Sequence, residues 1–188
     1  MINRSIKALG VALGTATVFL ASQQAMALSI SANGGDNSFG AEASQTIFPS
    51  IRAGVGYLNT DDSGHNAKAY SGSLMFSPYL PGLDLSVGAR YQYQDTHYGN
   101  GGGVGLGGSA FVDTPIPLTS IGAYGFYTPD GMTSGDIEKS YEYGAQARVN
   151  LISQTYAYVG YRYLRTDFDN DDDHTLDSGP VLGVSVGF

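Results

Sequence analysis

The segment that decides the fold is Leu83-Asp-Leu-Ser-Val-Gly-Ala-Arg-Tyr-Gln-Tyr-Gln94. Apolar or aromatic residues occupy every odd position, and polar residues or glycine occupy every even position. Side chains of a β-strand point alternately to opposite faces, so this period of two predicts a strand with one apolar and one polar face. A helix would mix both kinds of residue on each side and is excluded here.

The same alternation recurs after residue 27 and predicts an all-β chain of ten strands, or of eight if the first pair merges or lies outside. The expected strands cover residues 28–33, 38–47, 51–59, 69–77, 83–94, 104–112, 118–128, 140–150, 155–165 and 179–188. Long connections are expected at 60–68, 95–103, 129–139 and 166–178, with short ones between them. No connection fits a helical crossover, so the strands are expected to be antiparallel throughout.

The first residues have the pattern of a targeting segment. Arg4 and Lys7 precede an apolar stretch over residues 8–21, and Ala25-Met26-Ala27 places small residues at the −3 and −1 positions of a cleavage site. This pattern predicts a cleavable signal peptide over residues 1–27 and a barrel domain over residues 28–188. The apolar stretch is too short for a membrane anchor, which needs about 20 apolar residues.

Composition restricts the function classes. The 188 residues include 17 acidic and 9 basic residues, so the net charge is −8, and it becomes −10 once Arg4 and Lys7 are removed. An acidic exported chain is a poor nucleic-acid ligand, because phosphate contacts need clustered basic residues. The absence of cysteine excludes thiol-based metal sites, disulfides and a lipid anchor on cysteine. We therefore expect no cofactor and no nucleic-acid partner.

Three features favour a transmembrane β-barrel in the outer membrane over a secreted or periplasmic β-protein. The expected strands have about the 10 residues that a tilted crossing requires. Long and short connections alternate, which is typical of barrels with external loops and short periplasmic turns. The chain ends on Phe188, and this terminal aromatic resembles the signal that the barrel-assembly machinery reads. The mean hydropathy of −0.10 is then the average of a lipid-facing and a lumen-facing set.

Aromatic residues are expected at the two membrane boundaries. With both termini periplasmic, eight tyrosines lie toward the external ends of their strands and Phe188 lies near the other rim. Rings at the water–lipid boundaries form the girdles of outer-membrane barrels. The expected girdle comprises Tyr57, Tyr70, Tyr91, Tyr93, Tyr141, Tyr143, Tyr161, Tyr163 and Phe188.

The alternation also places charged residues inside the barrel. Barrels of 8–10 strands are filled by side chains, whereas wide aqueous pores need about 16 strands. We therefore expect salt bridges across the interior, since unpaired buried charges are costly. Glycines such as Gly54 and Gly56 leave a narrow channel for small solutes or ions as the alternative. The expected lumen charges are Glu42, Arg52, Asp84, Arg90, Glu142, Arg148 and Arg162.

The expected external loops carry two further candidate sites. Asp169, Asp171 and Asp173 supply a D-x-D-x-D run that offers three oxygen ligands for a weakly bound divalent cation, although an EF-hand pattern is absent. The histidines His65, His97 and His174 lie near aspartates and define an enzyme hypothesis that ranks third, because no nucleophile at a recognisable spacing accompanies them.

The glycine-rich run over residues 101–108 is expected to be a flexible loop leading into a kinked strand, since it lacks the Lys-Ser/Thr of a phosphate-binding loop.

Four segments resemble the YfaZ family of small bacterial outer-membrane proteins. They are Phe126-Tyr-Thr-Pro-Asp-Gly-Met-Thr-Ser-Gly135, Ser140-Tyr-Glu-Tyr-Gly-Ala-Gln-Ala-Arg148, Gly160-Tyr-Arg-Tyr-Leu164 and Asp177-Ser-Gly-Pro-Val-Leu-Gly-Val184. The resemblance implies a Gram-negative outer-membrane barrel and carries no catalytic residue. The sequence thus favours a non-enzymatic barrel with a structural or surface-interaction role, in contact with outer-membrane lipid and lipopolysaccharide and presenting acidic loops outside.

Overall fold

The computed structural model describes residues 27–62, 65–152, 154–169 and 173–188. Apart from Ala27, the predicted signal peptide lies outside these residues. Among the described residues, no helix is long and apolar enough to span a membrane. The described elements are β1 (Leu28–Gly35), β2 (Ser38–Phe48), β3 (Ile51–Asp62), β4 (His65–Phe76), β5 (Tyr79–Leu80), β6 (Leu83–Thr96), β7 (Gly99–Asp113), β8 (Thr119–Thr128), β9 (Thr133–Gly135), β10 (Ile137–Ile152), β11 (Thr155–Phe168) and β12 (Asp173–Gly187).

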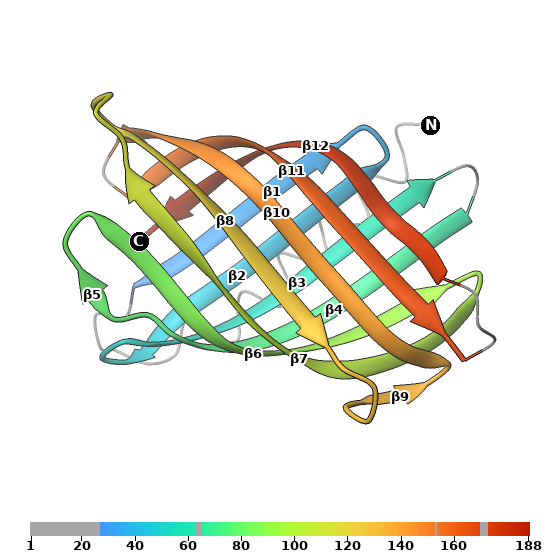
Figure 1. The fold of residues 1–188 in the computed structure, drawn as a ribbon. Helices are drawn as coiled ribbons and strands as arrows, with labels where there is room; N and C mark the ends of the chain where they lie inside the picture. Colours follow the sequence, from blue (N-terminus) through green and yellow to red (C-terminus); the bar gives the residue numbers. More distant parts are fainter. Residues whose placement is uncertain (1–26, 63–64, 153, 170–172) are drawn as a thin grey trace.

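Ten of these strands form a closed antiparallel barrel, and the predicted fold class is confirmed (Figure 1). Each long strand pairs with the next long strand along the chain, β12 pairs with β1, and the β6–β7 pairing completes the ring. The two short strands β5 and β9 pair with β6 and β7 respectively. We call the end where β1 begins and β12 ends the terminal end, and the other the opposite end.

The prediction of long connections at the opposite end is wrong at residues 60–68, 95–103 and 166–178, most of which belong to strands, whereas residues 129–136 between β8 and β10 do form a connection, which includes β9. Strands β3 and β4 remain paired up to Asp62 and His65, and strands β6 and β7 remain paired up to Thr96 and Gly99. The physical reason is that an antiparallel ladder continues wherever two backbones stay adjacent, whatever the polarity of the side chains. Polar residues tolerate this arrangement because both faces of a strand that projects beyond a membrane meet water.

The glycine-rich run at residues 101–108 is likewise part of strand β7, which corrects the expectation of a flexible loop. Its inward positions include Gly101, Gly103, Gly105 and Gly107. A Cβ at Gly107 would lie 2.7 Å from the Cα of Phe126, so the missing side chain lets the backbone of β8 approach closely. The glycines therefore allow the backbones of β7 and β8 to lie close together in this part of the wall.

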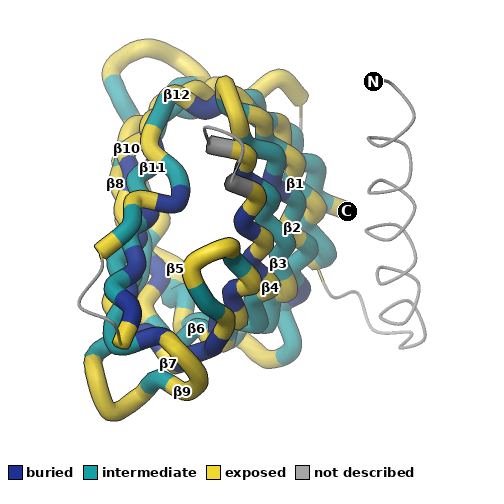
Figure 2. Tube along the Cα trace, turned by 90° about the vertical axis from the view of Figure 1, so that its right-hand side faces the viewer, coloured by how far each residue is buried: buried dark blue, intermediate teal, exposed yellow. Residues whose placement is uncertain are grey.

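The distribution of polar and apolar side chains is the reverse of that in a soluble protein, with polar residues inside and apolar residues outside. Polar side chains on the inner face are buried, among them Thr166 (0% exposed) and Gln94 (2%). Apolar side chains on the outer face are exposed, among them Leu182 (67%) and Val159 (52%). Figure 2 shows buried and exposed residues alternating along the strands. An apolar belt of this kind is costly in water and matches the hydrocarbon core of a membrane.

Candidate functional site: the barrel interior

The seven predicted lumen charges lie around one cavity. It has a volume of about 270 Å³ and begins near the terminal end, where Arg52 and Asp84 are the second residues of β3 and β6. The Asp84 side chain is 57% exposed, so the cavity reaches solvent at this end. Its charged lining consists of Glu42, Arg52, Asp84, Arg90, Glu142, Arg148 and Arg162.

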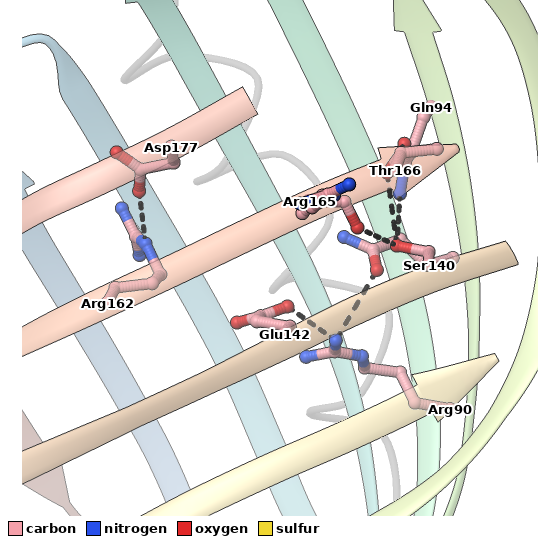
Figure 3. Close-up of polar contacts among 9 residues, drawn as sticks. Arg90, Gln94, Ser140, Glu142, Arg162, Arg165, Thr166 and Asp177 are labelled. Atoms are coloured by element: carbon pink, nitrogen blue, oxygen red, sulfur yellow. Dashed lines mark hydrogen bonds and ion pairs between the residues drawn. The ribbon is translucent and has the colours of Figure 1, made fainter. Parts of the chain in front are cut away.

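Two of the arginines are held by carboxylates across the lumen. Arg90 on β6 contacts Glu142 on β10 at 2.5 Å, and its guanidinium lies 4.0 Å from the ring centroid of Phe126 (Figure 3). Arg148 on β10 contacts Asp84 on β6 at 3.4 Å. The Arg148 guanidinium also lies over the ring of Phe111, on β7. These contacts bind β6 to β10, although β7 and β8 separate them in the wall.

Arg162 has a partner that the sequence pattern did not reveal. It donates to the Asp177 carboxylate (Figure 3). It also donates to Asn33 Oδ1 at 3.0 Å and to Ser38 Oγ at 3.0 Å. Asp177 falls in the segment predicted as a loop, but it belongs to β12. The register shifts beside it, so that Leu164 opposes Asp177 and Arg165 opposes Thr175, which leaves Leu176 as the bulged residue.

The remaining two charges are not paired. Within the described part of the chain, neither Glu42 nor Arg52 makes a hydrogen bond or an ion pair. Both side chains are exposed to the cavity, and they lie on the neighbouring strands β2 and β3. The interior is therefore asymmetric, with paired charges on the β6–β12 side and free charges on the β2–β3 side.

A layer of hydrogen-bonded polar residues lies between the cavity and the opposite end. Gln94 on β6 donates to Ser140 Oγ on β10 at 3.2 Å and accepts from Thr166 Oγ1 on β11 at 2.8 Å. The hydroxyls of Ser140 and Thr166 are 3.1 Å apart. All three residues are buried, and Figure 3 shows them converging from their three strands. On β6, Gln94 lies four positions closer to the opposite end than Arg90. On β10, Ser140 lies two positions closer to that end than Glu142.

Apolar side chains fill the same part of the barrel. Ala67 on β4 packs with Leu164 on β11 and Leu176 on β12, and the partly buried Leu58 on β3 joins them. Strands β4 and β11 lie on opposite sides of the ring, so this cluster extends across the lumen. Phe168, at the end of β11, is 1% exposed. The interior is thus packed at the opposite end and hollow at the terminal end.

The predicted girdle tyrosines lie on the outer face. Register pairs Tyr57 with Tyr70 and Tyr70 with Tyr93, which places three rings side by side on β3, β4 and β6. Tyr143 stacks on Tyr163 with 5.0 Å between ring centroids, and Tyr141 stacks on Tyr127, which was not among the predicted set, at the same separation. Of the other members, Tyr91, Tyr161 and Phe188 are exposed.

The candidate cation run is only partly described. Asp169 and Asp173 are exposed, whereas Asp171 lies outside the described residues. Asp173 forms an ion pair with Arg165. Among the described residues, no group of three or more His, Cys, Asp or Glu side chains has the arrangement that could hold a metal ion. Cation binding by the complete run stays a prediction.

The histidines of the enzyme hypothesis occupy the opposite end. His174 on β12 stacks on Tyr98 with 3.5 Å between ring centroids and an interplanar angle of 12°. His97 lies edge-on to the same tyrosine ring at 6.0 Å. Nothing is described of the His65 side chain, at the start of β4. The described contacts of His174 are therefore aromatic, with the rings of Tyr98 and Phe168.

A closed barrel with ten long strands, an apolar outer belt and a polar interior defines an outer-membrane β-barrel protein. The YfaZ precursor family matches residues 6–188, and the chain belongs to this family. The expected outer-membrane location agrees with both findings. A comparison with curated proteins finds no match.

Several solved structures are similar to this chain at low sequence identity. The outer membrane channel DcaP of Acinetobacter baumannii is 11% identical with a TM-score of 0.43, over 83% of this chain and 54% of that chain. A bacterial polysaccharide outer membrane secretin is 14% identical with a TM-score of 0.47, over 83% and 57%. The NanC porin is 11% identical with a TM-score of 0.46, over 86% and 99%. The chain spans little more than half the length of the first two.

Proposed function

We propose that the protein is a closed, non-enzymatic outer-membrane barrel that acts through its acidic external rim rather than by conducting solutes. The observation that carries this proposal is the packed layer across the lumen. Gln94 and Thr166 bond from two strands that are not neighbours, and Ala67, Leu164 and Leu176 form one apolar cluster from β4, β11 and β12. A continuous path for ions would have to cross both sets of contacts.

The rim supports the second half of the proposal. With the terminal end in the periplasm, the opposite end faces outward, and acidic residues outnumber basic ones there. Ion pairs such as Lys139–Asp167 at 3.2 Å neutralise only part of this charge. Lipopolysaccharide, bridged by divalent cations, is the partner we propose for this surface. The rim carries Asp36, Asp61, Asp95, Asp130, Asp136, Glu138, Asp167, Asp169 and Asp173 against Lys68, Lys139 and Arg165.

Single-channel recording in planar bilayers tests the closed state. The wild-type barrel should give no current steps above those of the empty bilayer. A triple variant, Gln94→Gly, Leu164→Gly and Thr166→Gly, removes side chains from both sets of contacts and should produce steps if it folds. Steady conductance by the wild-type protein would instead establish the narrow channel and overturn the closed-barrel proposal.

A further inference from the structure

The wall of the cavity formed by β2, β3 and β4 carries polar groups that no other side chain uses. Glu42, Ser44, Arg52, Ser71 and Ser73 all line the cavity. None of the five makes a hydrogen bond or an ion pair within the described ranges. The facing wall differs, because the guanidinium groups of its arginines already contact carboxylates and aromatic rings. We call these five residues the polar shelf.

The two charges of the shelf are held apart by the strand register. Glu42 pairs with Gly56, and Arg52 pairs with Thr46, so the two charged residues are four positions apart along the β2–β3 ladder. At about 3.4 Å per residue, their backbones are about 14 Å apart along the ladder. This separation explains why the carboxylate and the guanidinium form no ion pair across the bare strand surface between them.

Glycine and serine shape the surface between the charges. Gly54 and Gly56 occupy the inward positions between Arg52 and the level of Glu42, so the inner face of this part of β3 has no side chains. The hydroxyl oxygens of Ser73 and Ser71 lie 2.7 Å and 2.6 Å from where a Cβ would stand on these two glycines. The result is a shallow strip lined with hydroxyl groups that carries a negative charge at one end and a positive charge at the other.

We propose that the polar shelf binds a small zwitterion of the amino-carboxylate class, with its ammonium group at Glu42 and its carboxylate at Arg52. An anion alone would be repelled by the Glu42 carboxylate, and a cation alone would be repelled by the Arg52 guanidinium. A zwitterion gives both charges a direct partner, which Glu42 lacks even though the more distant Arg90 and Arg148 act on it electrostatically. The serine hydroxyls can donate to or accept from its polar atoms.

The size and opening of the cavity fit this ligand class. Its volume of about 270 Å³ is near the lower end of the roughly 300–1,000 Å³ typical of ligand pockets. Arg52 lies near the terminal end, where the exposed Asp84 marks the mouth. The packed layer around Gln94 closes the other side, so the ligand enters and leaves at the terminal end. This inference goes beyond the proposed function: the route of entry rests on the closed state proposed above, whereas binding at the shelf does not depend on whether the barrel conducts.

Isothermal titration calorimetry of the full-length mature chain, folded in detergent, tests the site with 6-aminohexanoate. Hexanoate and hexylamine each carry one of its two charged groups and serve as matched ligands. The zwitterion should bind at least about tenfold more tightly than either. Glu42→Gln and Arg52→Gln should each weaken its binding at least about tenfold, because each leaves one ligand charge uncompensated. Glu138→Gln, at the rim, should bind as the wild type does.

A charge reversal separates recognition from misfolding. The double variant Glu42→Arg/Arg52→Glu exchanges the two ends of the shelf, and the same zwitterion should bind it in the reversed orientation. Heat-modifiable migration on gels verifies that each variant is folded. No heat with 6-aminohexanoate on the folded wild type, or equal affinity for hexanoate, hexylamine and the zwitterion, would overturn the proposal.

Discussion

Thr166 on β11 donates a 2.8 Å hydrogen bond to Gln94 on β6, although β7, β8 and β10 separate these strands in the wall. The bond therefore crosses the lumen. Its surroundings are dry, since both residues are at most 2% exposed. A polar contact of this kind links two distant parts of the barrel wall across the lumen.

Replacing Thr166 by alanine should destabilise the barrel by about 1–3 kcal/mol, because it removes a partner from the buried amide of Gln94. Urea unfolding in phospholipid vesicles, followed by tyrosine fluorescence, measures this change. Thr175→Ala is the control, because Thr175 is exposed and bonds only the Tyr163 hydroxyl. Equal unfolding midpoints for the two variants would contradict a stabilising role for this contact.

The Arg90–Glu142 pair should respond asymmetrically to substitution. Glu142→Gln leaves the Arg90 charge without its carboxylate and should destabilise the barrel by about 3–5 kcal/mol. The double variant Arg90→Met/Glu142→Leu removes both charges and should recover most of this loss. Lys139→Ala breaks a partly exposed ion pair at the rim and should move the urea midpoint much less. If the double variant were no more stable than Glu142→Gln, burial of an unpaired charge would not be the cause.

The alternation of polar and apolar residues was sufficient to predict the ten strands and the side of the wall on which Arg90 or Tyr143 lies. It failed where its period breaks. The bulge at Leu176 turns both Leu176 and Asp177 inward, so no parity rule assigns Asp177 to Arg162. The extent of β7 was missed because glycine carries no polarity signal, and only the neighbouring backbones show that the segment is a strand.

A charge on the outer belt tests the membrane assignment directly. Leu182 is 67% exposed on the outer face of β12, and Leu182→Arg should cost about 2–4 kcal/mol in a bilayer. The fraction of heat-modifiable barrel after refolding into phospholipid vesicles should fall accordingly. Thr175→Arg lies on the same strand near the opposite end and should refold normally. Normal refolding of Leu182→Arg would show that this face does not meet lipid.

The close approach of β7 and β8 can be tested with a single methyl group. Gly107→Ala places a Cβ 2.7 Å from the Phe126 Cα and should destabilise the barrel by about 1–3 kcal/mol. Gly72→Ala is the matched control, because a Cβ there meets no atom within 4 Å. It should be neutral or slightly stabilising, since alanine loses less conformational entropy on folding than glycine. Urea midpoints in vesicles distinguish the two outcomes. An unchanged midpoint for Gly107→Ala would mean that the backbones of β7 and β8 can move apart at this point without cost.

The terminal aromatic residue should matter for assembly more than for stability. The backbone of Phe188 closes the ring, because its amide donates to the Leu28 carbonyl at 2.8 Å and its carbonyl accepts from the Leu28 amide at 3.2 Å. Its ring is exposed and buries little surface. Phe188→Ala keeps both backbone bonds, so refolding in detergent should match the wild type. We propose that the barrel-assembly machinery reads this ring, which predicts a severalfold lower yield of folded barrel in outer membranes of expressing cells.

Phe76→Ala is the control for this last experiment, because Phe76 is also exposed and also ends a strand at the terminal end of the barrel. Loss of either ring removes the same contact with lipid, whereas only Phe188 lies at the end of the chain. Recognition by the assembly machinery therefore predicts a lower cellular yield for Phe188→Ala alone, with equal refolding of both variants in detergent. Equal cellular yields would assign the effect of Phe188 to lipid contact and would remove the reason for a recognition signal at this position.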